Sequence, residues 1–180
     1  MIEIIPNWHP VLVHFTVALI TIAVVFYWLS FIISSIFFKS PLAQELEIVS
    51  RWCLWLGAII TIGTVTAGFY AYFTVNHDTP SHLAMIIHRN WALATATTIF
   101  LLALWSMVRY FHHQEINITF LIVLLIMQGL LLTTAWHGAE LVYRHGLGVL
   151  SLPQTENESP GHEHKIESKE MDNKSTNHQH

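Results

Sequence analysis

The chain has 180 residues, of which 53% are hydrophobic and only 11% are charged, and its formal net charge is −4. Soluble domains carry about 25% charged residues, so this composition excludes an ordinary soluble protein, and no basic patch suggests binding to nucleic acid. The single cysteine, Cys53, excludes an internal disulfide, a cysteine-ligated iron–sulfur cluster and a C-x-x-C-H covalent haem site.

Four long apolar segments follow one another along residues 1–150. They span about Val11–Phe38, Ile48–Val75, Leu83–Tyr110 and Ile116–Trp136. Each can supply the roughly 20 residues that a helix needs to cross a bilayer, and helices are required because so few segments cannot close a barrel. We therefore predict an all-α, polytopic membrane four-helix bundle as one transmembrane domain.

Turn and capping residues separate the four segments. Ser40-Pro41 ends the first segment, and Thr79-Pro80-Ser81 starts the third. Asn117 or Glu115 is expected to cap the fourth segment, because a side-chain oxygen there can accept a bond from a free helical N–H. Beyond the four segments themselves, no internal repeat is evident.

The composition changes after the fourth segment. Residues 151–180 are nearly free of apolar side chains and cannot bury a core, which predicts a disordered, histidine-rich tail. The tail holds two H-x-H pairs, His162 with His164 and His178 with His180. Such tracts bind Cu, Ni or Zn, so the tail is expected either to gather a metal ion or to be plain solvated sequence.

The positive charges favour one orientation in the membrane. Lys39, Arg51 and Arg109 lie in or beside the first and third loops, against Arg89 and Arg144 at the other ends of the segments. By the positive-inside rule these loops face the cytoplasm. We therefore predict a multi-pass protein of the bacterial inner membrane with both termini outside the cytoplasm.

Histidine is the unusual residue, with 13 copies against 8 for lysine and arginine together. Seven of them fall at, or beside, the ends of the segments on the predicted outer side. They are His9, His14, His77, His82, His88, His137 and His145. Ionisable groups at membrane depth are costly and usually functional, so we expect an imidazole-rich layer at the outer end of the bundle.

Histidines that face one another from neighbouring apolar helices are how membrane cytochromes hold haem b. We expect His14 to face the bundle interior and to ligate haem b together with His88 or His137, while His9 lies at the helix start and is partly wet. Small residues of the second segment make room for the ring or, alternatively, allow close helix packing. They are Gly57, Ala58, Gly63, Thr64, Ala67 and Gly68.

Other residues at the outer end are candidates to complete a site. Arg89 and Arg144 could meet the haem propionates, although such arginines also anchor lipid phosphates. The Glu140 carboxylate can orient a ligating imidazole, or this stretch can form an interfacial re-entrant turn in which Glu140 pairs with Arg144. His9 and His145 are further candidate metal ligands.

The opening stretch HPVLVHF, His88-Arg89 and the closing stretch HGAELVYRHGLGV resemble the bacterial membrane family catalogued as domain of unknown function 2231. The resemblance covers about residues 8–149, and the chain departs from the family pattern at Thr16 and Ala139, where Pro and Gly are frequent. It implies a four-span fold, and some similar proteins are joined to cytochrome-c-like domains. The histidines that match the family motifs are His9, His14, His88, His137 and His145.

These observations favour a haem b-binding, redox-linked membrane protein that moves electrons near the outer face. Its expected partners are the lipid bilayer and a cytochrome or other redox protein. One alternative is a metal-ion handling protein that uses the histidine-rich tail, and another is a non-catalytic membrane subunit. A hydrolase is not expected, because neither a Ser-His-acid nor an H-E-x-x-H arrangement is present.

Overall fold

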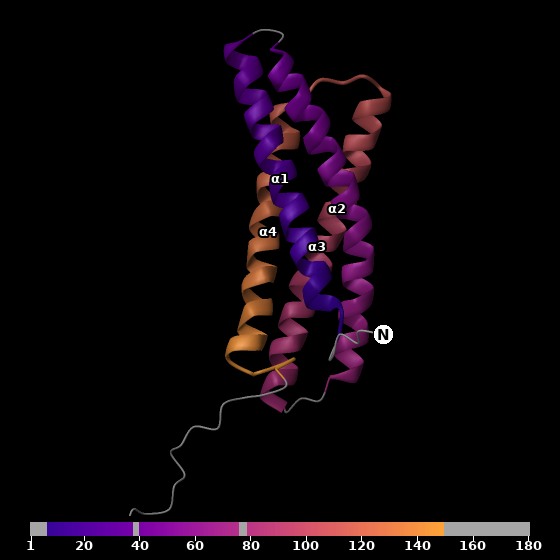
Figure 1. Cartoon of the computed structure of the whole chain (residues 1–180), viewed down its shortest axis with the longest axis vertical. Helices are drawn as coiled ribbons and strands as arrows, with labels where there is room; N and C mark the ends of the chain where they lie inside the picture. The colour runs from indigo at the N-terminus through magenta and orange to yellow at the C-terminus, as the bar shows by residue number, and fades with distance from the viewer. Residues whose placement is uncertain (1–6, 38–39, 76–78, 150–180) are drawn as a thin grey trace, which may run out of the picture. The chain divides into compact units, whose positions relative to one another are not determined.

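The computed structural model describes residues 7–37, 40–75 and 79–149, which form an antiparallel bundle of four helices (Figure 1). The helices are α1 (His9–Ile36), α2 (Pro41–Thr74), α3 (Thr79–Phe111) and α4 (Ile118–Tyr143). The described residues contain no strand. The prediction of an all-α four-helix bundle is confirmed, while the predicted tail, with its four histidines, lies outside the described residues.

Local sequence explains where the helices begin and end. Both α1 and α2 have a proline in their first turn, where its missing N–H is not needed. The Asn117 side chain caps α4 by accepting a 2.8 Å bond from the Phe120 backbone N–H, as predicted. However, α4 continues beyond Trp136 to Tyr143, because one helical glycine, Gly138, costs only about 1 kcal/mol.

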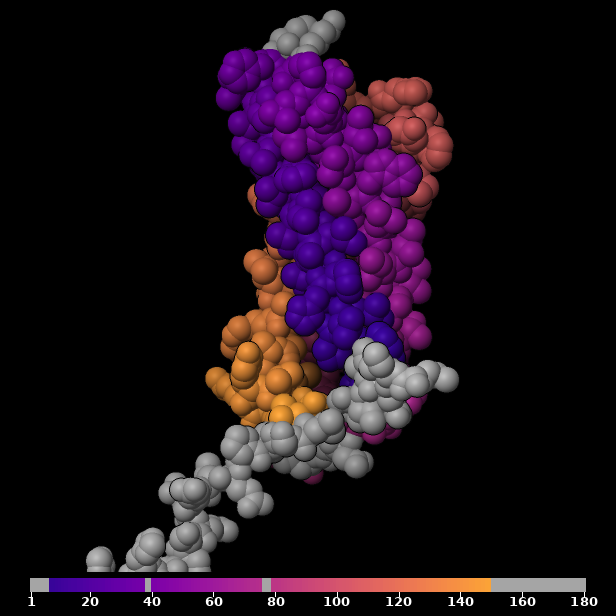
Figure 2. Space-filling view, viewed as in Figure 1, coloured from indigo at the N-terminus to yellow at the C-terminus, as the bar shows by residue number. Residues whose placement is uncertain are grey.

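Each helix packs against two others, in the cyclic order α1, α2, α3, α4, so α1 and α3 lie on one diagonal of the bundle. In the space-filling view α1 covers the front between α2 and α4 (Figure 2). The starts of α1 and α3 and the ends of α2 and α4 share one end, the histidine end, which carries His9 and His88. We call the opposite end, which carries Arg51 and Arg109, the arginine end.

The bundle has an apolar interior and an apolar exterior. Its most completely buried large side chains are Ile20, Leu54, Ile99, Leu102, Phe120, Leu121, Leu124 and Met127. All four helices are long and apolar enough to cross a membrane. In the most apolar 18-residue stretch of each helix, only 28–33% is buried inside the bundle. An apolar surface of this extent is suited to lipid rather than to water, so the chain is an integral membrane protein in contact with the bilayer.

Candidate functional site at the histidine end

The histidine of α1 that faces the neighbouring helices is His9. The prediction that His14 turns inward is wrong, because its side chain is exposed and its Nδ1 bonds to the Pro10 carbonyl of its own helix. His9 lies seven residues, or about two turns, before the buried Thr16 and therefore shares its face of α1. His14 lies only two residues before Thr16, which places it about 160° away around the helix.

The His9 ring is fixed between α1 and α2. Its Nδ1 lies 2.9 Å from the Thr64 carbonyl oxygen of α2. Because a carbonyl only accepts, Nδ1 must carry the proton, and Nε2 keeps its lone pair. A Cβ atom added to Gly68 would lie 3.0 Å from the His9 Cε1 and Nδ1 atoms, so the ring occupies the space that a glycine leaves. Two turns deeper, the Thr16 and Thr64 hydroxyls bond at 2.8 Å.

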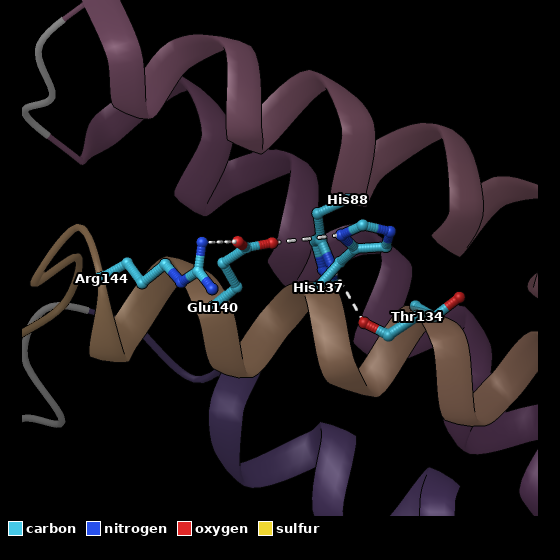
Figure 3. A network of polar contacts seen from close by, with 5 residues as sticks. All are labelled: His88, Thr134, His137, Glu140 and Arg144. Atoms are coloured by element: carbon cyan, nitrogen blue, oxygen red, sulfur yellow. Dashed lines mark hydrogen bonds and ion pairs between the residues drawn. The ribbon is translucent and has the colours of Figure 1, made fainter.

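The His88 ring is fixed between α3 and α4 by the same kinds of contact. Its Nδ1 lies 3.2 Å from the Thr134 carbonyl oxygen (Figure 3), which again leaves Nε2 as the unprotonated nitrogen. A Cβ atom on Gly138 would lie 3.1 Å from the His88 Cε1 atom. The Thr95 and Thr134 hydroxyls bond at 2.8 Å. The glycine that α4 carries near its end is thus required by the position of the His88 ring.

The two helical hairpins, α1–α2 and α3–α4, therefore repeat one arrangement that the sequence analysis missed. In each, a histidine precedes a threonine by seven residues on the first helix, and a threonine precedes a glycine by four on the second. The two sets are His9, Thr16, Thr64 and Gly68, and His88, Thr95, Thr134 and Gly138. The shared spacing H-x6-T with T-x3-G is the signal in the sequence that could have revealed it.

The repeated arrangement brings the two fixed imidazoles together across the bundle. The ring centroids of His9 and His88 are 6.2 Å apart, and the ring planes meet at 78°. Within the described ranges neither Nε2 atom takes part in a hydrogen bond. The histidine end therefore presents two partly buried imidazoles, each oriented through Nδ1 and each with a free lone pair on Nε2.

A second polar network lies beside His88 on α4 (Figure 3). The Glu140 carboxylate lies 3.5 Å from His137 Nδ1 and 3.1 Å from Arg144 Nη1. The His137 ring also stacks on the Trp91 ring of α3, with the two ring centroids 6.1 Å apart. The pairing of Glu140 with Arg144 is confirmed, but the re-entrant turn is wrong, because α4 continues through Glu140 to Tyr143. Glu140 also contacts the His137 imidazole, and ligation of a metal by that imidazole stays a prediction.

The remaining candidates are spread around the histidine end. Arg89 Nη1 lies 3.4 Å from the Tyr72 hydroxyl and ties α3 to α2, while His145 Nδ1 lies 3.4 Å from the Ser81 hydroxyl. Across the described part of the chain, no three His, Cys, Asp or Glu side chains gather closely enough to hold a metal ion. Three of the candidate metal ligands, His9, Glu140 and His145, thus form no joint site. The other four lie in the tail, outside the described residues: His162, His164, His178 and His180.

A comparison with protein families agrees with the motifs at the two ends of the bundle. A family model described as "Predicted membrane protein (DUF2231)" matches residues 6–151, a range that includes all four helices and both motifs. No curated protein and no solved structure matches the chain. The resemblance seen in the sequence is thereby confirmed.

Proposed function

We propose a function for this chain, which belongs to the DUF2231 family of predicted membrane proteins: it binds haem b through His9 and His88 and takes part in membrane electron transfer. The observation that carries the proposal is the pair of imidazoles that face each other from diagonal helices at 6.2 Å. His88 was expected as a ligand from the sequence, and His9 takes the place of His14 as its partner.

The spacing of the two rings suits one metal ion between them. Metal–imidazole bonds are about 2.0–2.1 Å long, so two imidazoles on opposite sides of one ion have ring centres about 6 Å apart. The ligating nitrogens must be unprotonated, and both Nε2 atoms meet that condition because each Nδ1 faces a carbonyl oxygen. A bis-histidine haem needs this pair of neutral imidazoles.

The chain supplies the hydrogen-bond acceptors that such ligands require. A ligating histidine usually donates its other N–H to a carbonyl or carboxylate, which fixes the ring and raises its basicity. Thr64 and Thr134 provide those carbonyls here, and Gly68 and Gly138 let the rings approach the helices closely. The bound haem would supply the one-electron chemistry, while these residues set its ligation and orientation.

The site lies at one end of the bundle, where a redox protein can approach it. Arg51 and Arg109 lie at the opposite end, and Lys39 falls in the sequence between α1 and α2. The positive-inside rule assigns that end to the cytoplasm. We therefore place the histidine end on the outer face of a bacterial inner membrane, with a cytochrome or another redox protein as the partner. A reporter fused after residue 180 should be active only outside the cytoplasm.

The experiment is an absorption spectrum of the full-length protein, purified in detergent from cells supplied with ample haem. We expect a Soret band, a dithionite-reduced spectrum of the six-coordinate b type, and one haem per chain by pyridine haemochromogen assay. Purified protein without Soret absorbance would overturn the haem assignment. Colourless protein that instead binds Cu(I) through His9 and His88 would replace it with metal handling.

A further inference from the structure

The arginine end holds a cavity that the proposed haem site does not use. Its volume is about 320 Å³, and it is lined by residues of α1, α2 and α3 and of the segment between α3 and α4. Tyr27, Glu47, Arg51, Arg109 and Tyr110 form part of its wall. It lies where α3 ends and the segment to α4 begins, which is near the depth of lipid headgroups if the bundle spans the bilayer.

Arg109 of α3 gives this cavity its chemistry. The side chain is only 5% exposed, and both of its terminal nitrogens, Nη1 and Nη2, are buried without a hydrogen-bond partner. Its guanidinium lies 5.1 Å from the centre of the Phe120 ring. A buried charge without a partner is strongly destabilising, so this guanidinium requires an acceptor from outside the described residues.

Arg51 of α2 contributes a second guanidinium in a similar state. Its Nε atom is buried without a partner, and its guanidinium lies 4.3 Å from the centre of the Tyr110 ring. In the part of the chain that the structure describes, neither arginine forms an ion pair, although the half-buried Glu47 lines the same cavity. The buried and half-buried groups Arg109, Arg51 and Glu47 sum to a formal charge of +1, and the exposed Glu115 brings the whole lining to zero.

We infer that this cavity binds the phosphodiester of an acidic lipid headgroup through Arg109 and Arg51. The planar guanidinium is the side chain best suited to two-pronged binding of phosphate oxygens. Basic pockets between membrane helices bind anionic headgroups in this way, and the Tyr110 ring beside Arg51 is 46% exposed on the surface of the bundle.

The test uses the full-length protein in vesicles of phosphatidylcholine, with and without phosphatidylglycerol, and measures the thermal unfolding midpoint. We expect phosphatidylglycerol to raise the midpoint of the wild type and of Arg144→Gln, whose arginine is exposed at the other end. The shift should be lost in Arg109→Gln. If Arg109→Gln does not fold, Arg51→Gln carries the test, because that side chain is only half-buried.

Two results would overturn the assignment of the cavity to a phosphate group. One is an equal phosphatidylglycerol shift in the wild type and in the variants of both cavity arginines. The other is no shift in the wild type, which would mean that water alone solvates the guanidinium. A shift produced equally by inorganic phosphate in phosphatidylcholine vesicles would assign the cavity to a free anion and overturn the lipid as its source. The haem spectrum reports on the opposite end, so the two proposals fail separately.

Discussion

The hairpins α1–α2 and α3–α4 share one arrangement and differ in what surrounds it. Both hold a histidine against a carbonyl oxygen and a glycine of the partner helix. In α4 the residue before that glycine is His137, which continues into the network with Glu140 and Arg144. The equivalent residue in α2 is Ala67, and no such network follows it in the described residues.

The difference separates what the two-histidine site needs from what lies beside it. The carbonyl and glycine contacts that occur in both hairpins hold the two imidazoles in place. A ligand shared by the two rings therefore needs these contacts at least. The His137 network occurs once and is partly exposed at Arg144. We therefore expect variants of the shared contacts to have larger effects than variants of the network.

The largest effect is expected when a shared histidine is removed. His88→Ala should abolish the six-coordinate spectrum, because it deletes one of the two histidines that we propose hold the haem. His137→Ala should keep the Soret band, since its ring is held by Glu140 and Trp91 beside the site. Spectra of both variants, normalised to protein, check this. Loss of haem in His137→Ala with retention in His88→Ala would show that the unshared network holds the cofactor.

A smaller effect is expected from filling the space that each ring occupies. Gly68→Ala and Gly138→Ala place a Cβ atom 3.0 and 3.1 Å from a histidine ring, which should displace the ring and destabilise the fold by about 1–3 kcal/mol. Gly129→Ala is the matched control, because no atom lies within 4 Å of its Cβ. That control should be neutral or up to about 1 kcal/mol stabilising.

Denaturant unfolding in detergent measures these differences, and the haem spectrum reports the displaced ring. If all three alanine variants behave alike, the glycines do not accommodate the histidines. If only one of the two ring-facing variants is affected, the hairpins are not equivalent, and the comparison between them holds only for their hydrogen bonds.

A still smaller effect is expected from the paired threonines. Thr16→Val and Thr95→Val each remove one hydroxyl from an interhelical bond of 2.8 Å. Bonds of this kind between membrane helices contribute about 0.6 kcal/mol on average, so each variant should be destabilised by roughly that amount. The control is Thr98→Val, whose exposed hydroxyl bonds only within α3. Unequal losses at Thr16 and Thr95 would show that one hairpin depends more on this bond.

The smallest effect is expected at Glu140. Glu140→Gln weakens the pairing with Arg144, which is 71% exposed, and exposed ion pairs contribute about 0–1 kcal/mol. The unfolding midpoint should change little, and the wavelength of the Soret band should stay the same. A large spectral change would place Glu140 and His137 within the site and contradict the distinction drawn between the two hairpins.

The sequence predicted the parts of the fold that depend on long apolar segments and on local capping. The four helices and the Asn117 cap follow directly from those patterns. Which face of each helix turns inward was harder to predict. The greater depth of His14 along α1 favoured that residue, but His9 lies seven residues before the buried Thr16 and therefore shares its inward face.

The site depended on contacts that no single segment reveals. The carbonyl partners of His9 and His88 lie 55 and 46 residues away, although the repeated spacing was present to be found. Arg51 and Arg109 entered the sequence analysis only as a count of charges for orientation. Their missing partners became visible only once the helices had been assembled around the cavity.

The most direct test of the account compares His9→Ala with His14→Ala, expressed and purified side by side with ample haem. The two histidines lie on one helix, but only His9 contacts the second hairpin, through its 6.2 Å approach to His88. We predict that His9→Ala loses the six-coordinate haem spectrum while His14→Ala keeps it. Haem retained in His9→Ala and lost in His14→Ala would contradict the assignment of the site.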